Sequence, residues 1–163
     1  MPRAVKVPAV PQGFHTVTPY LSVNGGIKAI NFYKKAFGAK EITKWRSQTP
    51  DGKVIHSRLR IGDSLVMVSD RFGPNRGDSK AQSPVTLHIY SKDVDKLWKN
   101  ALAAGAKVEM PLDDMFWGER YGQLRDPLGH RWSVSTLIRM SKEEMEAKRK
   151  KAMAMFGQGK QHK

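Results

Sequence analysis

Residues 17–41 read VTPYLSVNGGIKAINFYKKAFGAKE, and residues 85–109 read VTLHIYSKDVDKLWKNALAAGAKVE. Each stretch opens with alternating apolar and polar residues, which is typical of a half-buried strand, and continues with the apolar spacing of an amphipathic helix. Each helical pattern ends at a glycine, Gly38 or Gly105, the residue that most readily takes the left-handed conformation found at helix termini. The chain therefore contains the same strand and helix twice.

The repeat continues beyond these two helices. Residues 57–69, SRLRIGDSLVMVS, match residues 122–135, GQLRDPLGHRWSVS, as two strands joined by a tight turn that contains glycine. A further strand is expected directly after each helix, at residues 41–45 (EITKW) and 108–110 (VEM). The sequence thus predicts an α+β protein built from two tandem β-α-β-β-β modules.

The modules account for the middle of the chain. We expect a flexible N-terminal arm at residues 1–14, a domain at 15–137 with modules at 15–70 and 84–137 and a linker at 71–83, and a basic C-terminal helix and tail at 138–163. Ser141 and Glu144 have the spacing of a capping box, which predicts the start of that last helix. The helix is expected to run to about residue 156. The modules are expected to form a curved mixed sheet with a concave cleft, and whether they pair within one chain or across two chains stays open.

Composition limits the function classes. The 163 residues include no cysteine, so a metal site would have to use His, Asp or Glu. The net charge is +14, and from Arg139 onward eight residues are basic and three are acidic. Charge spread over the rest of the chain favours solubility and attraction of small anions, and we expect no nucleic-acid partner. No apolar run approaches the ~20 residues of a membrane span and no signal peptide opens the chain, so we expect a cytoplasmic protein without membrane contact.

Alternation along the predicted strands separates two faces. One apolar set, which includes Val17, Ile55 and Val85, is expected to pack under helix residues such as Ile30 and Leu102. The other set is expected to line the cleft, with an ordinary solvated face as the alternative. It comprises Thr18, Tyr20, His56, Arg58, Met67, Thr86, His88, Tyr121, Gln123, Arg131 and Ser133.

The paired modules, together with INFYKKAFGAK (30–40) and RDPLGHRWSV (125–134), resemble the vicinal oxygen chelate superfamily. That group includes glyoxalase I, bleomycin-binding proteins, fosfomycin-resistance enzymes and extradiol dioxygenases. The stretch FWGERYGQLRDPLGH (116–130) and the basic tail look closest to the PhnB-like, glyoxalase-like branch. The resemblance implies the fold described above, a homodimer and a cleft that takes a small molecule.

The resemblance also implies where a metal would bind. The His and Glu ligands of metal-dependent members fall here at Thr18, Met67, Thr86 and Ser133. A thioether is a soft ligand and neutral hydroxyls bind divalent ions weakly, so we expect no metal and no cofactor.

The candidate residues then have specific roles. His56 is the candidate general base, because imidazole titrates near neutral pH. Arg58 and Arg131 would hold a carboxylate or phosphate, unless acidic neighbours pair with them. Trp117 and Tyr121 lie on a loop that would form a pocket wall, a packed plug or a dimer contact. The full set of expected ligand-binding residues is Tyr20, His56, Arg58, Met67, His88, Trp117, Tyr121, Arg131 and Ser133.

Three functions follow from these observations. The first is a metal-free glyoxalase/bleomycin-resistance-like protein that binds a small anionic or aromatic molecule in a polar cleft. The second is a superfamily enzyme of the lyase, isomerase or dioxygenase type, with a non-standard site around His56 and His88 and a carboxylate such as Glu119; whether the protein is an enzyme stays open. The third, a basic nucleic-acid or partner-binding accessory protein, rests on charge alone.

Overall fold

The computed structural model describes residues 8–73 and 83–158, which belong to two compact units that divide after Ser79. Most of the predicted linker, the first half of the predicted arm and the last five residues of the tail lie outside the described residues. We call residues 1–79 unit one and residues 80–163 unit two.

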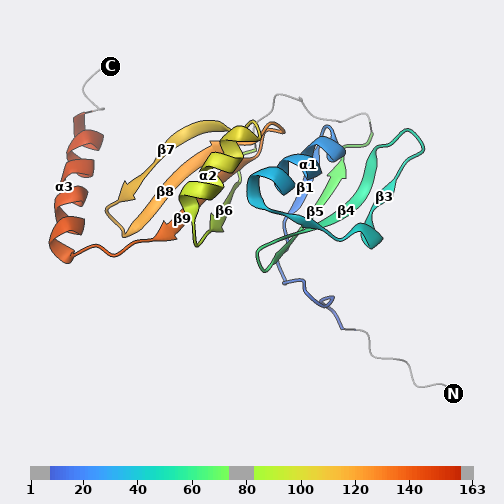
Figure 1. Ribbon diagram of the computed structural model, residues 1–163, viewed down its shortest axis with the longest axis horizontal. Coiled ribbons are helices and arrows are strands. Elements are labelled where there is room, and N and C mark those ends of the chain that lie inside the picture. Colours follow the sequence, from blue (N-terminus) through green and yellow to red (C-terminus); the bar gives the residue numbers. More distant parts are fainter. Residues whose placement is uncertain (1–7, 74–82, 159–163) are drawn as a thin grey trace. The chain divides into compact units, whose positions relative to one another are not determined.

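Unit one carries one mixed sheet and one helix (Figure 1). Its strands run in the order β1-β5-β4-β2, and β3 pairs with another part of β4; β1 is parallel to β5 and the other pairs are antiparallel. The elements are β1 (Tyr20–Val23), α1 (Gly26–Phe37), β2 (Lys40–Glu41), the 3-10 turn η1 (Thr43–Trp45), β3 (Ser47–Gln48), β4 (Val54–Ile61) and β5 (Ser64–Asp70).

Unit two repeats this arrangement. Its strands run in the order β6-β9-β8-β7, with β6 parallel to β9 and the other pairs antiparallel. The elements are β6 (Thr86–Tyr90), α2 (Val94–Ala103), β7 (Lys107–Met115), β8 (Glu119–Arg125), β9 (Arg131–Leu137) and α3 (Lys142–Gln158). The predicted α+β fold of two β-α-β-β-β modules followed by a C-terminal helix is confirmed.

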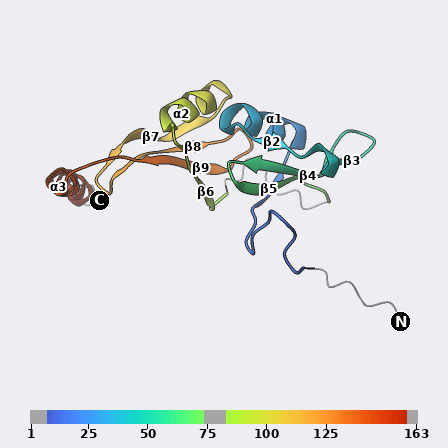
Figure 2. The same cartoon turned by 60° about the horizontal axis from the view of Figure 1, so that its bottom comes forward.

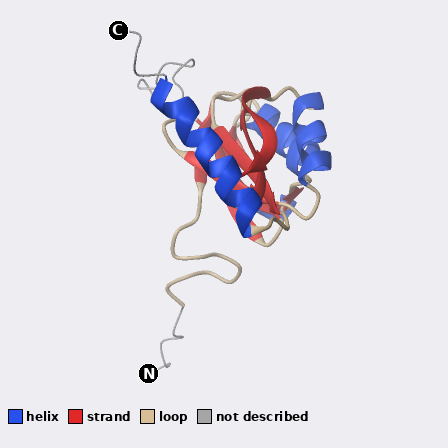
Figure 3. Cartoon of the chain, turned by 90° about the vertical axis from the view of Figure 1, so that its left-hand side faces the viewer, coloured by secondary structure: helices blue, strands red, loops and turns tan. Residues whose placement is uncertain are grey.

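Helix α3 begins where the sequence places it. Ser141 Oγ accepts a hydrogen bond from the Glu144 backbone N–H at 3.1 Å, and Glu144 Oε2 accepts one from the Ser141 N–H at 2.8 Å. This reciprocal pair is the predicted capping box. The helix continues unbroken to Gln158, two residues beyond the expected end (Figure 3). None of the helices in residues 8–73 and 83–158 combines the length and apolar character of a membrane span.

Helices α1 and α2 each cover one face of the sheet in their own unit (Figure 2). In unit two the Trp98 ring of α2 lies directly on Gly122 of β8, where an added Cβ would stand 2.6 Å from the ring. Only glycine allows this close approach. Because neighbouring residues of a strand point to opposite faces, Tyr121 and Gln123 lie on the face that α2 leaves open.

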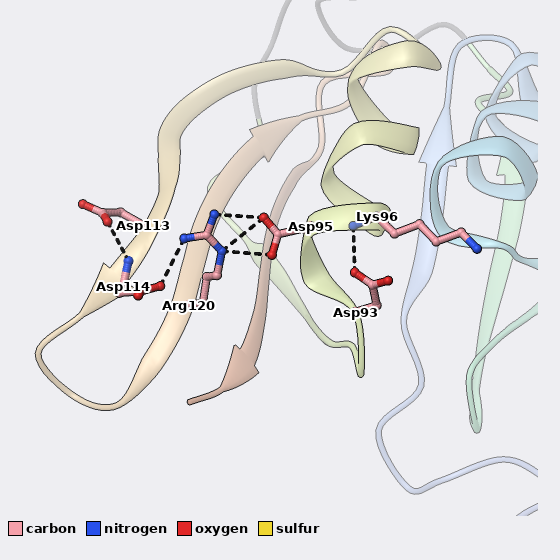
Figure 4. A network of polar contacts seen from close by, with 6 residues as sticks. All are labelled: Asp93, Asp95, Lys96, Asp113, Asp114 and Arg120. Carbon is pink, nitrogen blue, oxygen red and sulfur yellow. Dashed lines mark hydrogen bonds and ion pairs between the residues drawn. The ribbon is translucent and has the colours of Figure 1, made fainter. Parts of the chain in front are cut away.

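Arg120 fastens α2 to the strands beneath it (Figure 4). Its guanidinium pairs with Asp95 of α2 at 2.9 Å and with Asp114 of β7 at 3.1 Å. The hydrogen bonds that Arg120 donates to these two carboxylates raise its pKa. At the helix start, Asp93 accepts a hydrogen bond from the Lys96 N–H at 3.0 Å and so caps α2.

A buried carboxylate holds unit one together at the start of α1. Asp70, at the end of β5, accepts backbone hydrogen bonds from Gly25 at 2.8 Å, Gly26 at 2.9 Å and Val54 at 2.7 Å. The N–H groups of Gly26 and Val54 would otherwise be buried without acceptors, which costs about 1–3 kcal/mol each. Asp70 thus ties the helix start to two strands.

The strand predicted at residues 41–45 is wrong beyond its first residue. Strand β2 ends at Glu41, and the chain turns through η1 instead. The Glu41 side chain, only 2% exposed, accepts hydrogen bonds from Arg46 at 2.6 Å, Lys34 at 2.7 Å and Ser57 at 3.0 Å. Burial raises the pKa of Glu41, but these hydrogen bonds outweigh it and lower the pKa to about 2. The return of Arg46 to Glu41 favours the turn over a continued strand.

Four residues expected in the apolar core are exposed. Val17 and Val85 each precede the first residue of their strand, so neither is held in the sheet. Ile55 lies before the point at which β4 pairs with β5, and Leu102 lies in the last turn of α2. The predicted face assignment therefore fails at the ends of elements, where the periodic pattern continues but the neighbouring strand or helix does not.

Candidate functional site

The polar face of unit one brings together four predicted residues. Tyr20 of β1 pairs in register with Met67 of β5, which pairs with Arg58 of β4. His56 lies two residues before Arg58 on the same face, and its ring meets the Tyr20 ring at 90° with 5.9 Å between centroids. Strand pairing and the two-residue repeat of β4 therefore place Tyr20, Met67, Arg58 and His56 close together on one face of the sheet.

Arg58 is held between two aromatic rings. Its guanidinium carbon lies 4.0 Å from the centroid of Trp45 in η1 and 4.9 Å from the centroid of Phe14. Its Nε donates to His56 Nε2 at 3.3 Å. Stacking and a hydrogen bond to a neutral ring fix the position of the guanidinium without neutralising its charge.

A pocket of about 400 Å³ opens beside this clamp. Three of its lining side chains are cationic and none is acidic; the lining residues are Gln12, Gly13, Phe14, Ile42, Lys44, Trp45, Arg58, Arg60 and Leu65. No salt bridge within residues 8–73 and 83–158 involves Lys44, Arg58 or Arg60. The volume lies in the range of small-molecule sites, and the charges favour an anion.

His56 is neutral in this setting. Burial lowers the pKa of His56, and the neighbouring charge of Arg58 lowers it further. Because Nε2 accepts the Arg58 hydrogen bond, the neutral ring carries its proton on Nδ1. The ring lone pair that a general base would use is therefore already engaged.

Unit two carries the equivalent row. His88 of β6 occupies the register position of Tyr20, and Ser133 of β9 occupies that of Met67. His88 Nδ1 is hydrogen-bonded to Ser133 Oγ at 2.7 Å, and His88 Nε2 to Ser135 Oγ at 3.0 Å. Desolvation against the sheet lowers the pKa of His88, and the charge of Glu119 opposes that shift. Both ring nitrogens of His88 thus have hydroxyl partners.

Aromatic rings extend this row. Tyr121 of β8 stacks on His88 at 5.9 Å between centroids, and its hydroxyl accepts a hydrogen bond from Gln123 at 2.8 Å. The Trp117 ring meets Tyr121 edge-on at 5.6 Å and meets Phe116 at 5.0 Å. Trp117 and Tyr121 therefore lie beside His88 on the open face of the unit-two sheet.

Arg131 differs from Arg58 in its charge balance. Its Nε donates to Glu109 Oε2 at 2.6 Å, and Glu109 also pairs with Arg125. Arg131 is therefore paired with an acidic neighbour, as the sequence allowed, whereas Arg58 has no such partner in residues 8–73 and 83–158.

The positions that correspond to metal ligands do not fit a divalent ion. Thr18 donates to the His15 carbonyl at 2.9 Å and Ser133 is bonded to His88, while Met67 and Thr86 offer a thioether and a neutral hydroxyl. Within the residues that the structure describes, no three His, Asp or Glu side chains gather at metal-binding distances. Three neutral hydroxyls, two of them already hydrogen-bonded, and one thioether make a poor donor set for Mn²⁺, Zn²⁺ or Ni²⁺.

Several pocket residues were not predicted from the sequence. Phe14 belongs to the segment assigned to a flexible arm, and Lys44 and Trp45 to a segment assigned to a strand. Only Arg60 carried a usable signal, because it continues the alternation of His56 and Arg58. Nothing in the local pattern around Trp45 indicates that its ring stacks on a residue thirteen positions away.

Comparison with known proteins agrees with this architecture. The model of the Glyoxalase/Bleomycin resistance protein/Dioxygenase superfamily matches residues 14–134. The uncharacterized protein Mb0911c of Mycobacterium bovis is 40% identical over 150 residues, covering 88% of this chain and 95% of that protein.

Two solved structures show the same fold. Protein PA1353 from Pseudomonas aeruginosa superposes with a TM-score of 0.61 at 27% identity, over 77% of this chain and 99% of that one. The PhnB protein from Bacillus cereus superposes with a TM-score of 0.57 at 21% identity, over 75% and 99% of the two chains. The chain therefore belongs to the Glyoxalase/Bleomycin resistance protein/Dioxygenase superfamily, with PhnB-like and glyoxalase-like proteins among its structural neighbours.

Proposed function

We propose that the pocket of unit one binds a small molecule that carries an anionic group and an aromatic ring, without the help of a metal ion. The observation that carries this proposal is the Arg58 guanidinium, which is fixed between Trp45 and Phe14 and has no carboxylate partner in residues 8–73 and 83–158. A positioned, uncompensated guanidinium is suited to a carboxylate or phosphate.

The surrounding residues support the same ligand class. Lys44 and Arg60 add two further cations to the pocket, and Leu65 and Ile42 provide apolar contacts. The exposed ring of Trp45 offers a flat surface for a ligand ring. Glu41 holds Arg46, the residue that follows Trp45, so this ring is positioned before a ligand arrives.

Hydrogen bonding supports binding rather than acid–base catalysis. The lone pair of neutral His56 is engaged by Arg58, and both nitrogens of His88 are engaged by serine hydroxyls. In the basic helix α3, Arg149 pairs with Glu146 and Lys148 donates to the Asp114 carbonyl, so these two cations already have partners in the protein.

Calorimetric titration with 2-naphthoate and its uncharged amide, 2-naphthamide, tests the proposal. The carboxylate should bind saturably and the amide at least about tenfold more weakly, since one hydrogen bond to a charged group is worth about 1.5–3 kcal/mol. Arg58→Gln should weaken naphthoate binding by a similar factor. Arg139→Gln, which removes an exposed guanidinium outside the pocket, should leave it unchanged.

Two results would reject this function. One is equal binding of the acid and the amide. The other is an equal loss of affinity in Arg58→Gln and Arg139→Gln, which would reduce the interaction to the attraction of an anion by net charge.

A further inference from the structure

Glu119, the first residue of β8, is a carboxylate in an unusual setting for so basic a chain. Its Oε1 accepts a hydrogen bond from the Tyr90 hydroxyl at 3.3 Å, and its Oε2 accepts one from the Trp117 indole N–H at 3.2 Å. Both donors are neutral. No Lys or Arg in residues 8–73 and 83–158 forms a salt bridge with Glu119.

Four other acids of unit two have arginine partners. Asp95 and Asp114 share Arg120, Glu109 holds two arginines, and Glu146 pairs with Arg149. Glu119 instead has aromatic neighbours. Each of its carboxylate oxygens has two lone pairs and accepts one hydrogen bond here, so Glu119 has unused acceptor capacity.

The rings around Glu119 are both fixed and accessible. Tyr90 is 68% exposed and Trp117 is 42% exposed, yet each is held by its bond to the carboxylate. The Tyr90 ring also meets His88 edge-on at 4.4 Å, and Trp117 meets Tyr121 at 75° with 5.6 Å between centroids. Large exposed rings that cluster around one charge are typical of a binding surface.

Through its charge, Glu119 affects the pKa values of two neighbouring side chains, Tyr90 and His88. It raises the pKa of Tyr90, so the phenol keeps the proton that it donates, and it is the charged group that acts on His88, a neutral ring bonded to two serines. The Arg120 guanidinium, next in sequence, belongs to the opposite face of β8 and is neutralised by Asp95 and Asp114.

We propose that Tyr90, Trp117, Glu119 and Tyr121 form a binding site for an organic cation, in particular an alkylated ammonium group. The negative faces of aromatic rings attract such cations, and quaternary ammonium groups are the ligands that aromatic cages recognise best. The carboxylate adds a direct electrostatic contact. A bare metal ion fits less well, because it requires several oxygen ligands and the cluster has one carboxylate. The site uses unit two alone and does not depend on the pocket of unit one.

Choline and its uncharged isostere, 3,3-dimethylbutan-1-ol, provide a matched pair of probes. We would follow the indole N–H resonance of Trp117 in the full-length protein, assigned by its absence in Trp117→Phe. Choline should shift this resonance saturably with a dissociation constant in the millimolar range, and the neutral alcohol should bind at least about fivefold more weakly. Glu119→Gln should weaken choline binding by about two- to fivefold. Glu143→Gln, which removes an exposed acid from α3, should leave it unchanged.

Two variants of Trp117 test whether its aromatic ring contacts choline. Trp117→Phe keeps an aromatic face, so the choline methyl signals should still broaden in its presence, whereas Trp117→Leu should abolish the broadening. The proposal is overturned if choline and the alcohol bind alike, if Glu119→Gln and Glu143→Gln behave alike, or if Trp117→Leu binds choline as well as the wild type does.

Discussion

Replacing Glu41 by glutamine should remove a large pH-dependent contribution to the stability of unit one. The pKa of Glu41 is about 2, against an ordinary value of 4.5. One pKa unit corresponds to about 1.4 kcal/mol, so the lowered pKa contributes about 3 kcal/mol to folding. The contribution arises because the folded state binds Arg46, Lys34 and Ser57 through the charged carboxylate.

The sign of the effect follows from the lowered pKa. Above pH 4.5 the carboxylate is charged in both the folded and the unfolded chain, and the contribution is fully present. As the pH falls from 4.5 towards 2, the unfolded chain takes up a proton and the folded chain does not, so the contribution is lost. Glu41→Gln should therefore differ from the wild type by about 3 kcal/mol near pH 6 and by little near pH 2.

Urea unfolding at several pH values measures this difference. The indole N–H resonance of Trp45 is the best probe, because it reports unit one even if the two units unfold separately. Asp63→Asn is the matched control, since Asp63 is an exposed carboxylate that accepts only from Ser64. A stability difference for Glu41→Gln that stays constant from pH 6 to pH 2 would refute the assignment of the effect to this ion-pair network.

Three further predictions concern packing and titration. Gly122→Ala should cost about 1–3 kcal/mol, because the new methyl group would overlap the Trp98 ring, and an unchanged melting temperature would contradict this packing. Asp70→Ala should cost about 2 kcal/mol or more by leaving the buried N–H groups of Gly26 and Val54 without an acceptor. Asp70→Asn keeps one acceptor oxygen and should cost less; equal losses in denaturant titrations would argue against the hydrogen-bond account. NMR spectra should show a His56 pKa below its ordinary value, because burial and the charge of Arg58 both lower it. Arg58→Gln should raise the pKa of His56. A fall in that pKa would show that the charge of Arg58 does not lower it.

The repeated pattern was enough to predict most of the fold. Strand alternation and helix periodicity depend on neighbours in sequence, so β1 with α1 and β6 with α2 could be recognised as copies. The strand pairings of Tyr20 with Met67 and of His88 with Ser133 come from the structure and were not predicted. Prediction failed at the ends of elements and at η1, where an ion pair from a buried Glu41 decides the backbone path.

The candidate site was less accessible to sequence reasoning. The row of His56 and Arg58 follows from alternation in one strand, so it could be predicted. The Phe14–Arg58–Trp45 stack joins three segments that have no shared periodicity. Whether an arginine pairs with an acid also depends on tertiary structure. The same sequence reasoning covered Arg58 and Arg131, but in residues 8–73 and 83–158 only Arg131 has a carboxylate partner, Glu109.

The central claim is that the cationic pocket of unit one is where a small anion binds. The most direct measurement is an NMR titration of the protein with 2-naphthoate, recorded on the arginine side-chain Nε–H signals. The account predicts that the signals of Arg58 and Arg60 move together and saturate, while those of Arg139 and Arg149 stay in place. Equal movement of all four signals, or movement of the α3 signal alone, would contradict it.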